Sequence, residues 1–164
     1  MNIYDHVFSS AQVAEAAGMS HANFRAYLTR PNRWRVIGTK GTVGKSHLFT
    51  IFDCLTYALA YRLVQLGVDP AEALNRAALD FAHTGDEDRD PGGLFRYPEH
   101  GATLYVYCPG APVGKCVGSS DINSPLELFF APMSLAADSA VVIDLSKLRD
   151  RVFASLGLDA RDYE

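Results

Sequence analysis

The chain has 164 residues, of which 48% are hydrophobic and 21% are charged, and its formal net charge is -4. This size and composition predict one ordinary globular domain or two small ones, and they exclude a disordered or fibrous protein. No apolar run approaches the roughly 18 residues of a membrane span, and the first residues lack the basic and apolar segments of a secretory signal. Three cysteines are too few for a disulfide framework. We therefore expect a cytoplasmic protein with no membrane partner.

The charge is unevenly distributed along the chain. Residues 1–84 carry a net charge of +2, whereas residues 85–164 carry -6. Between Glu15 and Asp53 there is no acidic residue, but there are six basic ones: Arg25, Arg30, Arg33, Arg35, Lys40 and Lys45. An acid-free basic window predicts a phosphate-contacting surface, because lysine and arginine set against DNA release condensed counterions. The alternative is a charged face that is merely solvated.

Two short helices are predicted at the start of this window. Ser9 and Gln12 have the spacing of a capping box, and the helix that they begin ends at Gly18. Ser20 is placed to cap a second helix from His21 to about Thr29. Two short helices joined by a tight turn that contains glycine are typical of a helix-turn-helix, whose second helix enters the major groove of DNA.

A β-hairpin and two further helices follow. Residues 33–38 and 45–50 have the composition of strands and flank a glycine-rich turn. Apolar residues at helical spacing predict a helix over residues 51–66. Asp69 is placed to cap another helix, which begins at Pro70 and runs to about His83. The first domain, residues 1–84, is therefore predicted to be mainly helical.

The second part of the chain has a different character. Turn residues and four acids between Thr84 and Gly93 predict a linker, which leaves residues 94–164 as a second domain. Strands are predicted at 102–108, 126–130 and 140–144, and Ser146 is predicted to cap a last helix. The fold class is thus α+β: a helical N-terminal domain is followed by a small α+β domain for dimerisation or sensing.

Four segments of the first part, taken in their order along the chain, carry a resemblance to a known family. They are Val13–Ser20, Asn23–Tyr27, the glycine-containing hairpin to His47–Thr50, and Asp53–Val68 with Pro70–Leu74. On these segments, which cover less than half of the chain, the sequence resembles the winged helix-turn-helix domain of MerR-type transcriptional regulators. The resemblance implies a sequence-specific regulator that binds double-stranded DNA as a homodimer, with RNA polymerase as a further partner.

The resemblance and the basic window together predict the DNA-binding residues. The resemblance implies that Arg25 and Tyr27 approach the DNA backbone and that the later basic residues line the flank and wing. His21, Asn23 and Arg25 are expected at the groove end of the recognition helix. The complete predicted set is Ser20, His21, Asn23, Arg25, Tyr27, Arg30, Arg33, Arg35, Lys40 and Lys45.

The sequence departs from the MerR pattern after the first domain. In that family a long coiled-coil helix makes the dimer. Residues 84–101 contain prolines and glycines that forbid a continuous helix, namely Pro91, Gly92, Gly93, Pro98 and Gly101. If the protein dimerises, the C-terminal sheet and the helix over 146–156 are the expected surfaces. Phage excisionases and DNA-packaging subunits share the winged-helix plan and remain an alternative function, as does a protein-interaction module that keeps the fold as a scaffold.

No pattern of residues identifies an enzyme, a cofactor or a metal. The segment Gly41–Ser46 lacks the first glycine of a phosphate-binding loop, because that position is Thr39. Cys108 and Cys116 have a spacing that resembles the metal-binding loop of copper-sensing MerR-type proteins. The alternative, which we favour, is a pair of cysteines at strand ends that face each other across a turn. We therefore expect a protein that is not an enzyme and has no cofactor.

Overall fold

A computed structural model describes residues 5–29, 39–40, 47–77, 101–111, 114–124 and 139–159. The chain has an α+β fold with five α-helices in these ranges, a two-stranded hairpin and a three-stranded antiparallel sheet. The described parts of residues 1–75 and 150–164 form one compact unit, and those of residues 76–149 form another. The predicted linker at 84–93 and the predicted strand at 126–130 lie outside the described residues, so the domain boundary stays a prediction.

Helix α1 (Ser10–Ala17) has the ends that the sequence predicts. The hydroxyl of Ser9 accepts a hydrogen bond from the amide of Gln12, whose side chain accepts from the amide of Ser9. Gly18 ends the helix in the left-handed conformation at φ 78°, where a residue without a Cβ has no steric penalty. The amides of Gly18 and Met19 then donate to the carbonyls of Glu15 and Ala14, which satisfies the last turn.

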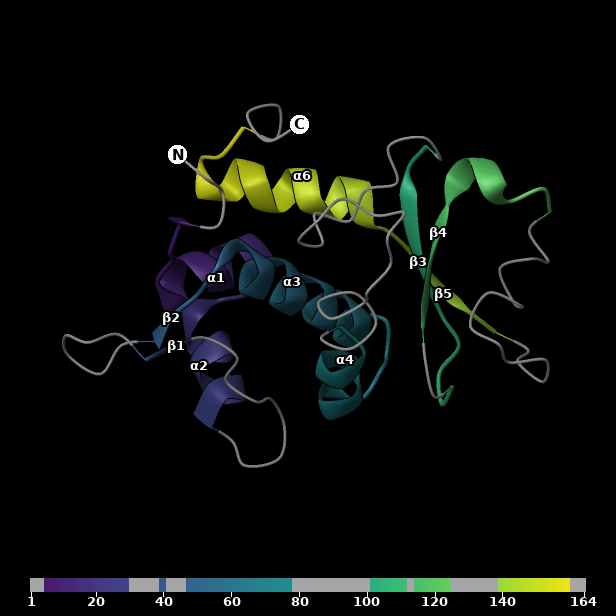
Figure 1. Cartoon of the computed structure of the whole chain (residues 1–164). Coiled ribbons are helices and arrows are strands. Elements are labelled where there is room, and N and C mark those ends of the chain that lie inside the picture. The colour runs from purple at the N-terminus through teal and green to yellow at the C-terminus, as the bar shows by residue number, and fades with distance from the viewer. Residues whose placement is uncertain are drawn as a thin grey trace. The chain divides into compact units, whose positions relative to one another are not determined.

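Helix α2 (His21–Thr29) follows after three connecting residues, Gly18–Ser20. Ser20 caps it, because its hydroxyl accepts from the amide of Asn23 at 3.2 Å. Helix α1 lies against both α2 and α3 (Ile51–Gln65), as Figure 1 shows. The predicted helix boundaries in this region are confirmed.

A short hairpin connects α2 to α3. Strand β1 (Thr39–Lys40) pairs antiparallel with strand β2 (His47–Leu48), with Thr39 opposite Leu48 and Lys40 opposite His47. The first strand therefore includes residues that the sequence predicts to be the turn, while the predicted strand at 33–38 lies outside the described residues. An isolated antiparallel bridge joins Phe49, directly after β2, to Phe8.

Three aromatic rings form the centre of the first unit. Phe24 from α2, Phe49 and Tyr57 from α3 are completely buried. Their ring centroids lie 5.0 to 5.9 Å apart, and every pair is edge-on, the arrangement that aromatic quadrupoles favour. This cluster joins α2, the hairpin and α3 through side chains far apart in the sequence.

Helices α3 and α4 (Pro70–Ala77) begin with strong caps. Thr50 and Asp53 form a reciprocal capping box at the start of α3. The carboxylate of Asp69 accepts from the amides of Ala71 and Glu72 at the start of α4. Residues 78–83, the predicted remainder of this helix, lie outside the described range.

The second unit contains a sheet of strand order β4-β3-β5. Strand β3 (Thr103–Tyr107) is central, and β4 (Lys115–Gly118) and β5 (Val141–Asp144) pair antiparallel with it. Strands β3 and β5 agree with the predicted strands, whereas β4 was not predicted. A short 3₁₀ helix, η3 (Ser119–Asp121), follows β4 directly.

The turn after β3 explains where the two nearby cysteines lie. The carbonyl of Cys108 accepts from the amide of Ala111 at 2.9 Å, and Gly110 between them has φ 84°. Proline at the second and glycine at the third position of this turn match a type II turn. In the register of the sheet, Cys116 lies opposite Tyr105 rather than Cys108. The expectation that the two cysteines face each other is therefore wrong, because the pair next to the turn is Val106 with Lys115, which leaves Cys108 outside the ladder.

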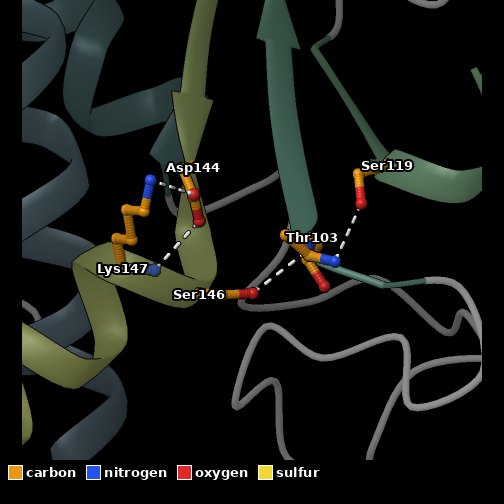
Figure 2. Close-up of polar contacts among 6 residues, drawn as sticks. Thr103, Ser119, Asp144, Ser146 and Lys147 are labelled. Carbon is orange, nitrogen blue, oxygen red and sulfur yellow. Dashed lines mark hydrogen bonds and ion pairs between the residues drawn. The ribbon is translucent and has the colours of Figure 1, made fainter.

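Helix α6 (Leu145–Leu156) continues directly from β5, and its cap differs from the prediction. Asp144, not Ser146, is the N-cap, because its Oδ1 accepts from the amide of Lys147 at 2.9 Å. Figure 2 shows that the Ser146 hydroxyl instead accepts from the amide of Thr103, while the Ser119 hydroxyl accepts from the amide of Ala102. These two serines satisfy the amides at the start of β3.

Within the part of the chain that the structure describes, no helix has both the length and the apolar surface needed to cross a bilayer.

Candidate nucleic-acid interface

Helix α2 presents one polar face to solvent. Phe24 is its one fully buried side chain, and Ala26, Tyr27 and Leu28 are half-buried. His21, Asn23 and Arg25 are exposed. Because residues four apart lie on the same side of a helix, His21 and Arg25 form one row with the exposed Thr29.

The first residues of α2 are oriented by its cap. The Ser20 hydroxyl oxygen accepts a hydrogen bond from the amide of Asn23. The hydroxyl hydrogen stays available to donate to a ligand. The first-turn amides give this end of the helix a partial positive charge. Ser20, His21 and Asn23 therefore surround an end that favours an anion.

His21 also has a partner on the neighbouring helix. Its Nε2 lies 3.0 Å from the hydroxyl oxygen of Ser10, the first residue of α1. The contact joins the starts of the two helices across the turn. Sequence analysis missed Ser10 as a site residue, and no local signal could have found it, since eleven positions separate the pair.

A hydrogen bond also holds the C-terminal end of the α2 row in place. The Thr29 hydroxyl donates to the carbonyl of Arg25 at 2.9 Å, within the last turn of the helix. Tyr27 is half-buried and engaged in an interaction. The structure thus places Arg25 on the exposed row, whereas Tyr27 is half-buried.

The face of α2 contains no acidic side chain, and the nearest acid after it in the sequence is used elsewhere. The carboxylate of Asp53 accepts from the amide and the hydroxyl of Thr50, at 2.7 and 3.0 Å. Burial raises the pKa of Asp53, although the hydrogen bonds from Thr50 oppose that shift. Asp53 is therefore part of the α3 cap. The sequence of α2 contains no acidic residue, so Arg25 has no carboxylate on its own helix.

The hairpin residues of the predicted site are only partly described. Lys40 occupies β1, where its backbone pairs opposite His47. The ring of His47 is half-buried beside Phe49, and its Nδ1 is buried without a hydrogen-bond partner. The other predicted basic residues of the flank and wing, Arg30, Arg33, Arg35 and Lys45, lie outside the described residues.

Comparisons with protein-family models, with curated proteins and with solved structures give no match for this chain.

The described ranges also contain no group of three or more His, Cys, Asp or Glu side chains that could hold a metal ion. Cys54, Cys108 and Cys116 are not joined in disulfides and are buried. Burial raises the pKa of the Cys108 thiol, which disfavours the thiolate that soft metal ions bind. The exposed residues of α2 are thus the best-defined candidate for ligand contact.

Proposed function

We propose that the first unit is a winged helix-turn-helix domain that binds double-stranded DNA through α2, and that the protein is a transcriptional regulator. The observation that carries the proposal is the acid-free exposed row of His21 and Arg25, on a helix held in place by the buried ring of Phe24. The order of the elements supports it, because two short helices, a hairpin and two further helices follow one another.

The chemistry of the exposed residues suits the major groove. An arginine can donate two parallel hydrogen bonds to guanine, and an asparagine can recognise adenine in the same way. Asn23 and Arg25 are exposed on α2 and supply these two types of side chain. Ser20 and the basic residues of the hairpin would contact phosphates, which fix the register of a protein on the duplex.

The proposal includes binding as a homodimer through the second unit. Regulators of this kind read two half-sites, so that the symmetry of the DNA site mirrors that of the protein. Val142 on β5 is a large apolar side chain with 42% of its surface exposed. Bound fragments recovered from genomic DNA would reveal the half-site spacing, and sedimentation of the free protein would give its oligomeric state.

The test compares Arg25→Ala with Arg62→Ala in a fluorescence anisotropy assay. Arg62 is an exposed arginine on α3, outside the acid-free window, and is a matched control. We expect Arg25→Ala to weaken binding to a duplex selected from a random pool by roughly 5- to 100-fold, as for the loss of one base-reading arginine. Arg62→Ala should bind like the wild type.

Salt dependence provides a second measurement. Substitutions of phosphate-contacting residues, such as Lys40→Ala, should reduce the slope of log affinity against log salt by about one for each contact. They should weaken the selected duplex less than Arg25→Ala does. Wild-type affinity and salt dependence in the Arg25→Ala variant would contradict the assignment of α2 as the recognition helix.

A further inference from the structure

The contact between His21 and Ser10 gives α2 a feature beyond its basic charge. Nε2 of His21 and Oγ of Ser10 are 3.0 Å apart, and they belong to the first residues of α2 and α1. We propose that Ser10 is a positioning residue that orients the His21 ring for hydrogen bonding to the duplex. This inference rests on the proposed DNA-binding function.

The contact determines which ring atom is available to a ligand. A histidine ring has two nitrogens, and Ser10 engages Nε2, so Nδ1 is the ring nitrogen left for the duplex. In the proposed arrangement the Ser10 hydroxyl donates to Nε2, which leaves the ring hydrogen of a neutral imidazole on Nδ1. The partner is therefore a hydrogen-bond acceptor on the duplex, either a phosphate oxygen or the N7 and O6 edge of guanine.

Orientation of the ring before binding has an energetic consequence. An exposed side chain loses rotamer freedom when it is immobilised at an interface, and this loss weakens binding. His21 is exposed, but its bond to Ser10 already restricts the ring in the free protein. Ser10 therefore strengthens binding through His21 without touching the DNA.

A double-mutant cycle on the full-length protein tests this role. The variants Ser10→Ala, His21→Ala and the double variant are titrated with a duplex selected by the wild type and with a random duplex at low salt. We expect Ser10→Ala to weaken the selected duplex by about fivefold, as for the loss of one hydrogen bond. His21→Ala should weaken it by roughly tenfold, because a single contact to the duplex is lost.

The decisive comparison is within the His21→Ala background, where Ser10→Ala should have no further effect. Ser10→Thr, which keeps the hydroxyl, should restore wild-type affinity. Equal losses on both duplexes would identify the acceptor as a phosphate, and losses confined to the selected duplex would identify it as guanine. Thermal midpoints of all variants report whether the fold is intact.

Two results would contradict different parts of the reasoning. A wild-type protein that binds neither duplex at low salt refutes the proposed function, and the inference with it. A wild-type protein that binds, combined with additive effects of the two substitutions or an unaffected Ser10→Ala variant, refutes the positioning role alone.

Discussion

Replacement of Phe24 by leucine tests whether one aromatic cluster holds the candidate recognition helix in place. Phe24 is completely buried and is the one fully buried side chain of α2. Leucine keeps most of the apolar surface but removes two edge-on ring pairs, with Phe49 and Tyr57. Each such pair contributes about 0.5–1.5 kcal/mol beyond its buried area, so the expected loss of unfolding free energy is about 1–3 kcal/mol. Alanine would lose about 3–5 kcal/mol, a large share of the stability of a small domain.

The measurement is urea unfolding followed by far-ultraviolet circular dichroism, with the midpoint and slope fitted separately. Leu66→Ala is the control, because that side chain is 48% exposed. A cycle with Tyr57→Leu should show coupling of about 0.5–1.5 kcal/mol between the two rings. A Phe24→Leu variant no less stable than the Leu66→Ala control would refute the role of the cluster.

Three further substitutions test other parts of the structure. Burial raises the pKa of Asp53, so the folded state binds its proton more tightly than the unfolded state. The contribution of this proton to the free energy of unfolding is complete below the unfolded pKa and is lost as pH rises through the folded pKa. In urea titrations, the stability of the wild type relative to Asp53→Asn should therefore fall as pH rises across the acidic range. Gly114→Ala would place a Cβ 2.6 Å from the ring carbon Cε2 of Tyr105 and should lower the unfolding free energy by about 1–3 kcal/mol; an unchanged urea midpoint would contradict that packing. Thr103 is completely buried and its hydroxyl has no hydrogen-bond partner, so Thr103→Val should raise the thermal midpoint, and a lower midpoint would show that the hydroxyl is satisfied.

Helix ends could be predicted because their signals are local. The capping box of Ser9 and the glycine that ends α1 involve residues within one turn of each other. The exposed face of α2 could be predicted for the same reason, because the helical spacing around Phe24 determines which positions face outward.

Elements that depend on distant residues could not be predicted. Strand β4 has no alternating pattern of its own and exists through its pairing with β3. Serine and aspartate are both good helix caps, and the choice of Asp144 over Ser146 follows from the contact of Ser146 with the amide of Thr103, 43 positions away. The contact between His21 and Ser10 likewise depends on how α1 and α2 pack.

The buried core residue and the exposed candidate interface belong to the same short helix. Phe24 points into the aromatic cluster, and the exposed row of His21 and Arg25 follows from the same helical spacing. Substitutions of the buried and of the exposed residues should therefore have separable effects. Arg25→Ala should lower DNA affinity at unchanged stability, because an exposed side chain away from the core contributes little to folding. Phe24→Leu should lower stability first, and it should reduce DNA affinity only as far as it loosens the helix that carries the exposed row.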